Sequence, residues 1–411
     1  MAKITIFGLG YVGLPLAVAF AEKGHKVIGF DIDERRVEEL RKGIDRKNEV
    51  KAERLKNAVV FYTNEIDYAK DSEFFIIAVP TPVDEFKVPD LNPVKEAAEL
   101  ISKVINKGAT VVLESTVYPG VTEEIVGSII ENKTGMKMGK DFKIGYSPER
   151  VNPGDKIHTL KTITKIVAGQ DKETTEKLAK LYGSICDNIY KAKSIKVAEA
   201  AKVMENTQRD VNVALMNELA IICDKMSISV WDVIDAMKTK WNALPFVPGL
   251  VGGHCIPVDP YYLLYKSENL GYHPRIIASG RIVSDYMDNY IIEKIIKSLN
   301  NIGLALKNRK VLFLGITFRE NISDMRNSMP CKLMQKLRNL GAEVVVVDPL
   351  ADVEGVLREM PHGDYDVIIF AVPHDEFIWQ KDRLLNIKTR IFFDVKGILR
   401  KEKPGEIYLT F

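Results

Sequence analysis

The sequence has few of the residues from which disulfide scaffolds and metal centres are built. Its 411 residues include only four cysteines, none with CxxC spacing, and six histidines, none paired as HxxxH or HxH. These patterns argue against a disulfide framework and a zinc site, and they indicate a reducing compartment. No apolar run approaches the roughly 20 residues of a membrane span, and the first residues leave no room for a signal peptide. We therefore expect a cytoplasmic protein with no metal and no membrane partner.

The chain also lacks an excess of charge of either sign. Its 58 Lys and Arg residues nearly balance 56 Asp and Glu residues, and no basic block or arm stands out. Nucleic acid is therefore not expected as a partner, whereas an anionic small substrate would need only a local cluster of Arg and Lys. The length is too great for one hydrophobic core and predicts two or three domains.

The N-terminal part alternates short strand-like runs with helical stretches. The runs "KITIFG", "HKVIGFDID", "SEFFIIAVPTP" and "ATVVLESTV" are apolar and bounded by glycine, proline or polar residues. Helical stretches lie between them, as in residues 91–107 and in "LPLAVAFAEKG", where Gly24 suits a helix C-terminus. Strands that alternate with helices predict right-handed crossovers and a parallel sheet.

The pattern changes in the middle of the chain and then returns. Residues 194–226 lack Gly and Pro and carry apolar residues at helical spacing, which predicts one or two long helices. A helix with Ser229 as its N-cap and a connecting helix over 274–300 follow. After residue 308, "RKVLFLGITF", "AEVVVVDPL" and "YDVIIFAVPHD" echo the first three N-terminal runs. The matched Asp and the matched "AVP" favour a pseudo-repeat over a chance likeness between two open sheets.

The motif "GLGYVG" predicts a dinucleotide site. Gly8 permits a tight turn, Gly10 lets the backbone approach a pyrophosphate, and Gly13 allows close helix–strand packing. Asp31 ends the second strand, where a carboxylate accepts the ribose hydroxyls and repels a 2′-phosphate, so NAD is favoured over NADP. Asp33 is the rival acid, and a glycine turn without a ligand is the alternative to the whole interpretation.

The second copy lacks this fingerprint. Gly315 is followed by "ITFRENISDMR", which has no second or third glycine but supplies Arg319, Asn321 and Arg326 at a loop-to-helix junction. Such a site suits the phosphates of another nucleotide. Exposed charges on a loop are the alternative.

Two sets of polar residues, both N-terminal to the last α/β domain, are candidates for catalysis. Lys202 and Asn206 are four residues apart on one helix, so a cation and an amide donor point the same way and could stabilise an oxyanion, although a solvated helix face is the alternative. Glu149, in "SPER" after a strand, could act as a general base for water, with a helix cap as its alternative. Thr116 follows another strand and could hold a water or a hydroxyl.

The loop "VGGHCIPVDP" holds the third candidate, Cys255. A metal site lacks further ligands at the right spacing, which leaves a buried structural cysteine or a nucleophile. Two glycines before the thiol and prolines after it describe a rigid loop with exposed backbone, and Asp259 could orient a water or a lysine nearby. The pattern therefore favours the nucleophile.

These motifs together resemble those of the nucleotide-sugar 6-dehydrogenases, the UDP-glucose/GDP-mannose dehydrogenase family. The similarity runs in order through "GLGYVGLPLA", "VPTP", "ESTVYPG", "SPER", "AEAAKVMENTQRDVNVALMNE", "GGHCIPVDP" and "FRENISDMRNS" and covers nearly the whole chain. The resemblance implies a four-electron oxidation, in which C6 of a hexose goes from alcohol to aldehyde to carboxylate with two NAD.

The resemblance also implies a role for each candidate. Cys255 would capture the aldehyde as a thiohemiacetal that becomes a thioester, Lys202 and Asn206 would stabilise oxyanions, and Asp259 would assist through a bound water. Glu149 and Thr116 would activate and place the hydrolytic water. The expected cofactor contacts are Gly8, Gly10, Tyr11, Val12, Gly13, Asp31, Arg36, Pro80, Thr81 and Thr116. The expected substrate contacts are Glu149, Arg150, Lys202, Asn206, Arg209, Gly252, Gly253, His254 and Arg319.

Departures from the family pattern bear on the substrate. Where UDP-glucose enzymes have GGxCxPKD, this loop has His254 before the cysteine and Val258 in place of the lysine. It is similar to the branch acting on UDP-N-acetylhexosamines, with Arg209 as a candidate for the acetamido or sugar hydroxyl groups. We expect UDP-N-acetyl-D-mannosamine, with UDP-N-acetylglucosamine and then UDP-glucose as alternatives. A two-electron β-hydroxyacid-type dehydrogenase and a non-catalytic NAD or sugar-nucleotide sensor are the rival classes.

The predicted architecture is α/β, with two Rossmann-like, doubly wound parallel-sheet domains flanking a central all-helical domain. Residues 1–190 form the NAD-binding domain. Residues 191–300 form the helical domain with the connector helix, the cysteine loop and the region expected to dimerise. Residues 301–411 form the UDP-sugar-binding domain. The resemblance suggests a homodimer or a dimer of dimers.

Overall fold

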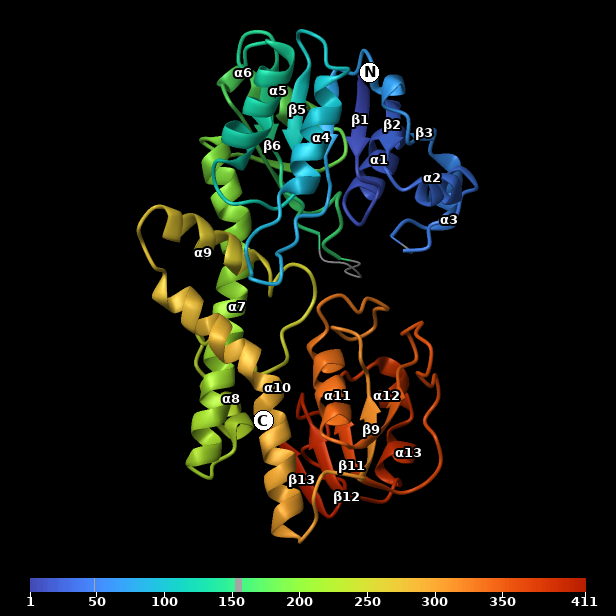
Figure 1. Ribbon diagram of the computed structural model, residues 1–411, viewed down its shortest axis with the longest axis vertical. Helices are drawn as coiled ribbons and strands as arrows, with labels where there is room; N and C mark the ends of the chain where they lie inside the picture. Colours follow the sequence, from blue (N-terminus) through green and yellow to red (C-terminus); the bar gives the residue numbers. More distant parts are fainter. Residues whose placement is uncertain (48, 152–156) are drawn as a thin grey trace. The chain divides into compact units, whose positions relative to one another are not determined.

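The computed structural model describes residues 1–47, 49–151 and 157–411. Its contacts divide the chain into two compact units. The first unit contains residues 1–205 and 261–271, and the second contains residues 206–260 and 272–411. Each unit is built on one sheet covered by helices (Figure 1). Within the described residues no helix is both long and apolar enough to cross a membrane.

The sheet of the first unit has the strand order β3-β2-β1-β4-β5-β6-β7-β8. Neighbouring strands are parallel except for β6 and β7, which are antiparallel. The central strands are buried along almost their whole length, as expected when helices cover both faces. The strands are β1 (Lys3–Phe7), β2 (Lys26–Phe30), β3 (Val60–Thr63), β4 (Phe74–Ile77), β5 (Thr110–Leu113), β6 (Lys143–Tyr146), β7 (Thr164–Gly169) and β8 (Asn188–Lys191).

Two helices of the first unit begin at side-chain caps. Asp33 and Asp171 accept hydrogen bonds from backbone N–H groups in the first turns of α2 and α6, as N-cap carboxylates do. One face of the sheet is buried by apolar side chains of α1 and α6, and α4 packs against α5 (Figure 1). The helices are α1 (Gly13–Glu22), α2 (Glu34–Arg41), α3 (Ala52–Asn57), the 3-10 turn η1 (Ile66–Ala69), α4 (Asn92–Ser102), the π-helix η2 (Thr122–Gly127), α5 (Ser128–Thr134) and α6 (Lys172–Tyr182).

Two helices belong to both units. The 31-residue helix α7 (Ile195–Lys225) starts in the first unit and ends in the second, and α9 (Asp259–Asn269) starts in the second and continues in the first. In the second unit, α8 (Val230–Lys238) begins at Ser229, whose side chain accepts from the Asp232 N–H. The long helix α10 (Arg275–Asn301) leads into the last sheet.

The sheet of the second unit is fully parallel, with the order β10-β9-β11-β12-β13. One of its faces packs with α8, α10 and α11, and the other packs with α12 and α13. Its strands are β9 (Lys310–Leu314), β10 (Glu343–Val347), β11 (Tyr365–Phe370), β12 (Thr389–Asp394) and β13 (Ile407–Thr410). Its helices are α11 (Met329–Asn339), α12 (Asp375–Trp379) and α13 (Lys381–Leu385).

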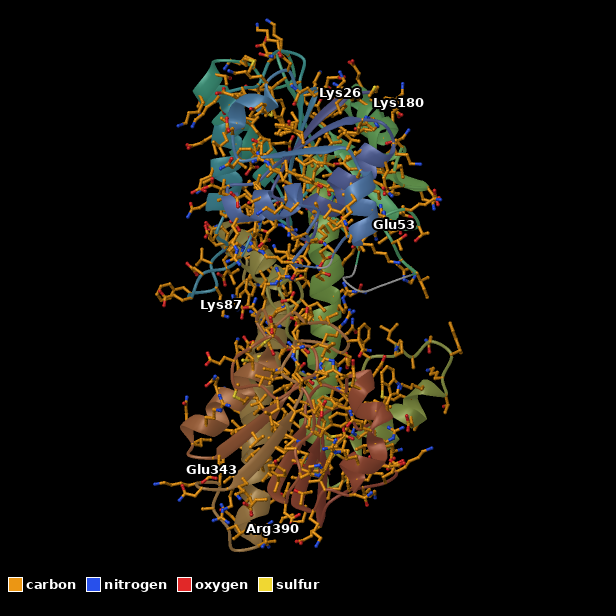
Figure 2. All side chains as sticks on the ribbon, turned by 90° about the vertical axis from the view of Figure 1, so that its right-hand side faces the viewer. Lys26, Glu53, Lys87, Lys180, Glu343 and Arg390 are labelled. Atoms are coloured by element: carbon orange, nitrogen blue, oxygen red, sulfur yellow. The ribbon has the colours of Figure 1, made fainter. Side chains whose placement is uncertain are left out.

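Charged side chains are exposed on the outside of each unit. Lys26 and Glu343 begin β2 and β10, and both are exposed (Figure 2). Other exposed charges shown in Figure 2 are Glu53, Lys87, Lys180 and Arg390.

The predicted fold class is confirmed, including the strand-like runs quoted for each sheet, the strand before "SPER" and the helices over 194–226 and 274–300. Strands β3, β7, β8 and β13 were not expected. The first sheet is therefore wider than predicted, and the antiparallel β6–β7 pair departs from an all-parallel sheet. The boundaries 1–190, 191–300 and 301–411 stay a prediction, since the contacts give two units that share α7 and α9.

Candidate active site

The glycine loop of the first unit needs each of its glycines for a different reason. Gly8 has φ +89°, and a Cβ there would lie 2.7 Å from the Ala78 carbonyl oxygen. A Cβ on Gly13 would lie 1.8 Å from the Gly8 carbonyl oxygen and 3.2 Å from Ile6 on β1. Gly10 is different, because among the described residues only the Lys47 Nζ comes within 4 Å of its Cβ position. Protein packing therefore explains Gly8 and Gly13, whereas the open space at Gly10 suits a ligand that approaches the backbone.

The two acids after β2 have separate roles. The Asp31 carboxylate accepts hydrogen bonds from the Leu9 N–H at 2.7 Å and the Asp33 N–H at 3.0 Å, which fixes it beside the glycine loop. Asp33 instead caps α2 through the Arg36 N–H and pairs with Arg46. The hydrogen bond from the Arg36 backbone lowers the pKa of Asp33, with burial opposing it and Arg46 adding to it. This geometry fits Asp31, rather than Asp33, as the acid available to a ribose.

Other expected cofactor contacts lie around the same loop. Tyr11 and Val12 are partly buried at the start of α1, and Thr81 is partly buried after β4 with Pro80 exposed before it. The hydroxyl of Tyr262, on the part of α9 that belongs to the first unit, donates to the Thr81 carbonyl at 3.0 Å. These contacts hold the "VPTP" segment in place. Contact with NAD remains a prediction for all four.

Arg36 has a different environment from the other expected cofactor contacts. Its side chain is only 2% exposed, donates from Nε to the Leu9 carbonyl at 3.0 Å, and pairs with Asp45 at 2.8 Å. The guanidinium therefore supports the glycine loop from the protein side. A direct contact with the cofactor stays a prediction.

The "SPER" segment presents Glu149 just after β6. One oxygen of this carboxylate accepts from the Arg150 and Val151 N–H groups, and the other lies 3.9 Å from the Lys165 Nζ. The Arg150 guanidinium is bound to Glu205 at 2.7 Å and to the Thr164 carbonyl. Glu149 is thus oriented by its own backbone turn. Arg150 already has an internal partner, and its contact with substrate stays a prediction.

A buried charge cluster beneath Glu149 was missed at the sequence level. Lys165, the second residue of β7, is 1% exposed and donates to Glu114 at 2.6 Å and to the Pro148 carbonyl at 2.9 Å. Burial raises the pKa of Glu114 to about 7, with Glu149 adding to the effect and Lys165 opposing it. A lysine inside the apolar run "TKIVAG" was the only sequence signal for this cluster.

A second missed residue connects the Thr116 segment to α7. Glu199 is fully buried and accepts from the Gly120 N–H at 2.6 Å and from both the N–H and the hydroxyl of Thr122. Burial raises the pKa of Glu199 to about 7, although these hydrogen bonds oppose the shift. Because Glu199 precedes Lys202 by three positions, it ties "ESTVYPG" to the same helix as the candidate lysine. An acid among the alanines of "AEAAK" was its sequence signal.

The lysine–amide pair predicted on α7 is buried rather than solvated. Lys202 is 8% exposed and Asn206 is 4% exposed. In the second unit, the Asn206 side-chain amide donates to Asp259 at 2.6 Å, and Arg209 donates to the Asn206 side-chain oxygen at 2.5 Å. The second unit therefore brings three of the expected residues, Asn206, Arg209 and Asp259, into one hydrogen-bonded group.

Cys255 lies on a tight turn that ends at Asp259. The Cys255 carbonyl accepts from the Val258 and Asp259 N–H groups, at 3.1 and 2.8 Å, and the thiol side chain is partly buried. The turn places the thiol-bearing residue directly before the carboxylate that binds Asn206. None of the described cysteines forms a disulfide. This arrangement fits a reactive loop better than a core segment.

The glycine pair before Cys255 packs against the C-terminal part of the second unit. A Cβ on either Gly252 or Gly253 would lie 2.9 Å from the Phe318 side chain, and Gly253 has φ +91°. Phe318 precedes the exposed Arg319. His254, next to Cys255, is partly buried and acts electrostatically on Asp324 of the same segment. Contact of these glycines, His254 and Arg319 with substrate stays a prediction.

The second glycine loop has the same backbone turn but a different carboxylate. Gly315 has φ +84°, and Asp348 after β10 accepts from the Ile316 and Thr317 N–H groups. The buried His374 lies 3.2 Å from the same oxygen of Asp348. Burial raises the pKa of Asp348, but the hydrogen bond and charge of His374 and the backbone N–H groups outweigh it, and the pKa lies below its usual value.

The side chains of the site indicate whether it binds a metal ion or a nucleotide cofactor. Among the described residues, no three His, Cys, Asp or Glu side chains gather where they could bind a metal ion. The first unit offers a glycine turn, a helix N-terminus and an acid fixed beside the turn, the features of a dinucleotide site. A fold with this site defines a dinucleotide-binding α/β protein as the class.

Comparison with known families gives the particular family. The NAD binding domain, central domain and UDP binding domain of the UDP-glucose/GDP-mannose dehydrogenase family match residues 2–186, 196–286 and 312–401. The chain belongs to this family, and it is an NAD-dependent nucleotide-sugar dehydrogenase with a UDP-binding domain.

Individual relatives match over nearly their full length. Protein CapL of Staphylococcus aureus is 49% identical, with 98% of this chain and 97% of that protein covered. The UDP-N-acetyl-D-glucosamine 6-dehydrogenase of Salmonella typhi is 46% identical at the same coverage. The solved structure of a UDP-D-ManNAc dehydrogenase from Pyrococcus horikoshii superposes with a TM-score of 0.90 at 30% identity, covering 99% of this chain and 98% of that one.

Proposed function

We propose that this protein oxidises C6 of a UDP-N-acetylhexosamine twice, from alcohol to carboxylate, through a covalent intermediate on Cys255. The observation that carries the proposal is the turn from Cys255 to Asp259, whose carboxylate binds the Asn206 amide at 2.6 Å. A thiol, a carboxylate and an amide donor are thereby assembled on one short segment and one helix. A two-electron dehydrogenase has no need of the thiol.

The cofactor contributes two oxidations, and the residues around it hold and orient it. When bound, NAD would supply the hydride acceptor for each of the two oxidation steps. Gly10 leaves the space for its pyrophosphate and Asp31 offers a fixed carboxylate to its ribose, which supports NAD over NADP. Tyr11, Val12, Pro80 and Thr81 border the same loop.

The covalent steps on Cys255 begin once the first oxidation has produced the C6 aldehyde. The Cys255 thiolate attacks the aldehyde carbon and forms a thiohemiacetal, which keeps the intermediate bound while the reduced cofactor is exchanged. Lys202 and Asn206, one turn apart on α7, stabilise the charge on the C6 oxygen. Asp259 assists through a bound water. Loss of a hydride from C6, which bound NAD would accept, and of the hydroxyl proton, which the water held by Asp259 would take, converts the adduct to a thioester.

Hydrolysis releases the product. Glu149 takes a proton from a water molecule, the resulting hydroxide attacks the thioester carbonyl, and the Cys255 thiolate leaves. Thr116 helps to place this water. Support comes from the orientation of the Glu149 carboxylate by two backbone N–H groups at the carboxyl end of the sheet. The net reaction consumes two NAD and one water per sugar.

Residues of the cysteine loop and of α7 bear on which sugar is oxidised. His254 and Val258 in the cysteine loop favour an N-acetylated hexosamine over glucose, and the buried Arg209 Nε, for which the described residues provide no hydrogen-bond acceptor, suits a sugar hydroxyl or acetamido group. The sequence favoured the manno epimer. The higher identity to a relative named for the gluco epimer supports UDP-N-acetylglucosamine as an equal candidate.

Binding of the uridine diphosphate is assigned to the last domain, with Arg319 toward the diphosphate or the sugar. The exposure of Arg319 beside the Phe318 that packs on Gly252 and Gly253 supports this role. A homodimer or dimer of dimers is also part of the proposal. It is supported by exposed apolar side chains on the long helices of the second unit, at Leu215, Ile222, Ile276 and Ile282.

One experiment tests the central claim. NADH formation should be followed with UDP-glucose, UDP-N-acetylglucosamine and UDP-N-acetylmannosamine, and the yield should be two NADH per sugar oxidised. Cys255→Ser should lose net turnover and keep NAD binding. A yield of one NADH would indicate a two-electron dehydrogenase, and an absence of NADH with every sugar would favour a sensor.

A further inference from the structure

Beneath Glu149 lies an ion pair for which the proposed mechanism has no use. Lys165 on β7 and Glu114 after β5 are 1% and 0% exposed, and their charged atoms are 2.6 Å apart. Burial of a charge pair is costly and is often no more stabilising than an apolar pair of the same size. The position of this pair under a candidate base therefore calls for a functional explanation.

The contacts of Lys165 connect it to Glu149 in two ways. Its Nζ donates to the carbonyl of Pro148, the residue before Glu149, at 2.9 Å. The same Nζ lies 3.9 Å from the free-standing oxygen of the Glu149 carboxylate, whose other oxygen is bound to backbone N–H groups. Lys165 therefore fixes the loop that carries Glu149 and places a buried cation 3.9 Å from its carboxylate.

We propose that the Glu114–Lys165 pair is a positioning device for Glu149. Lys165 fixes the loop and stabilises the ionised carboxylate, and Glu114 sets how much of the lysine's charge acts on Glu149. The inference rests on the proposed role of Glu149 in thioester hydrolysis. Glu114 and Lys165 are positioning residues, since neither is assigned a contact with substrate, cofactor or water.

The charges around the pair support this division. Burial raises the pKa of Glu114 to about 7, so this carboxyl changes its ionisation near neutral pH. Burial lowers the pKa of Lys165, but the charges of Glu114 and Glu149 outweigh burial and the pKa is raised, so the lysine stays protonated. One cation therefore serves two carboxylates. When Glu114 is neutral, the lysine acts mainly on Glu149.

The other titratable groups near the pair are neutral or already bound. Burial raises the pKa of Cys186 to about 12 and raises that of Tyr182, which packs under the Lys165 ammonium at 5.3 Å. On the outer side, Arg150 is paired with Glu205 of α7. Changes in Glu114 ionisation are thus the main variable that Glu149 experiences near neutrality.

The test compares Glu114→Gln with Lys165→Met in the full-length enzyme. The thioester is formed with NAD and the UDP-sugar that gives NADH, and its hydrolysis is followed by acid quenching and intact-protein mass spectrometry across pH. Loss of the cation should move the acid limb of the hydrolysis rate to higher pH by about one pH unit. Glu114→Gln should leave the acid limb in place, because Glu114 is already neutral at low pH, and should remove the change in rate near pH 7 that follows its ionisation. A structural role alone would not separate the two effects in this way.

Controls separate this result from general damage. Lys143→Met removes a lysine that pairs with Asp171 at 2.8 Å, at the opposite end of β6, and should leave the limb unchanged. Thermal stability and NAD binding report on folding. If Lys165→Met does not fold, Glu114→Gln tests the proposal by itself, because glutamine has nearly the same size as glutamate.

The outcomes are distinct. An unmoved acid limb in Lys165→Met, or a change in rate near pH 7 that persists in Glu114→Gln, would overturn the inference and leave the proposed function intact. Glu149→Gln should accumulate the thioester. If it hydrolyses the thioester at the native rate, the assigned role of Glu149 is wrong and the positioning role is wrong with it.

Discussion

The two glycine loops have the same backbone and different carboxylates. Gly8 and Gly315 have φ values of +89° and +84°, and each donates its N–H to the last residue of the neighbouring strand, at 2.9 and 2.8 Å. In each loop the following N–H is bound by an aspartate, Asp31 or Asp348, at 2.7 and 2.8 Å. One turn has therefore been built twice in one chain.

The two loops differ in whether the aspartate carboxylate is still accessible to a ligand. Asp31 is partly exposed, whereas Asp348 is fully buried and also accepts from the N–H groups of Thr317, Leu350 and Ala351, with His374 beside it. Two and five positions after Gly315 the second loop has Thr317 and Glu320, where the first has Gly10 and Gly13. The second copy thus retains the turn as a scaffold and has lost the features that hold a dinucleotide.

The largest effect should come from Gly13→Ala. The new Cβ would lie 1.8 Å from the Gly8 carbonyl oxygen, so the first turn of α1 must move away from the loop. We expect a loss of at least about 3 kcal/mol in the free energy of unfolding and no measurable NAD binding by calorimetry. The control is Gly24→Ala, with φ +81° and no atom near its Cβ position, which should cost only about 1 kcal/mol and keep NAD binding. Native NAD affinity in Gly13→Ala would show that the first loop does not need its third glycine.

Asp31→Asn and Asp348→Asn should have reciprocal effects. Asp348→Asn removes a buried acceptor of several N–H groups and should lower the free energy of unfolding by about 3 kcal/mol without changing NAD affinity. Asp31→Asn should leave stability nearly unchanged and weaken NAD binding by about tenfold, as expected for one lost charged hydrogen bond. Urea unfolding and NAD titration of both variants are needed. Equal effects on NAD binding would refute the distinction between the loops.

Buried carboxylates of the two units should also respond oppositely to pH. Glu199 has a pKa raised to about 7, so the folded state binds a proton that the unfolded state loses, and this stability is lost as pH rises toward 7. Asp348 has a lowered pKa, so its stability is lost as pH falls. Relative to the native protein, Glu199→Gln should gain about 2 kcal/mol between pH 5 and pH 7. Urea unfolding at several pH values measures this, and a flat difference would contradict the assignment.

The smallest effect should come from Asp33→Ala. Loss of the cap on α2 and of the ion pair with Arg46 should cost about 1 kcal/mol of stability. NAD affinity should stay within a factor of about two, because Asp31 is the acid fixed to the glycine loop. Thermal unfolding and NAD titration report the two quantities. A loss of affinity comparable to that of Asp31→Asn would assign the ribose to Asp33 instead.

Local patterns in the sequence were enough for much of this molecule. The pattern of glycines and the position of Asp31 predicted the first loop, because turn geometry depends on a few neighbouring residues. The helical spacing over 194–226 predicted α7, and "AVP" together with the matched aspartates predicted the repeated sheet. In each case one local rule dictates the structure.

The missing parts depend on contacts between distant residues. Strand β7 escaped notice because Lys165 interrupts its apolar pattern, and the lysine is neutralised by Glu114, 51 positions earlier. Glu199 likewise acts on Gly120, 79 positions away. The packing of Gly252 on Phe318 depends on a third such pairing. The candidate site residues could therefore be named from sequence, whereas the groups that orient them could not.

The course of the chain has a consequence for biosynthesis. The first sheet is complete once Lys191 has left the ribosome, yet the Tyr262 hydroxyl that binds the Thr81 carbonyl belongs to a segment synthesised only after residues 206–260. Domains generally fold as units during synthesis, N-terminal first. During synthesis the "VPTP" segment of the nucleotide-binding sheet therefore lacks its contact with Tyr262 until residues 261–271 have been made and have packed against it. Vectorial synthesis thus makes the loop carrying Cys255 emerge before the first unit can close.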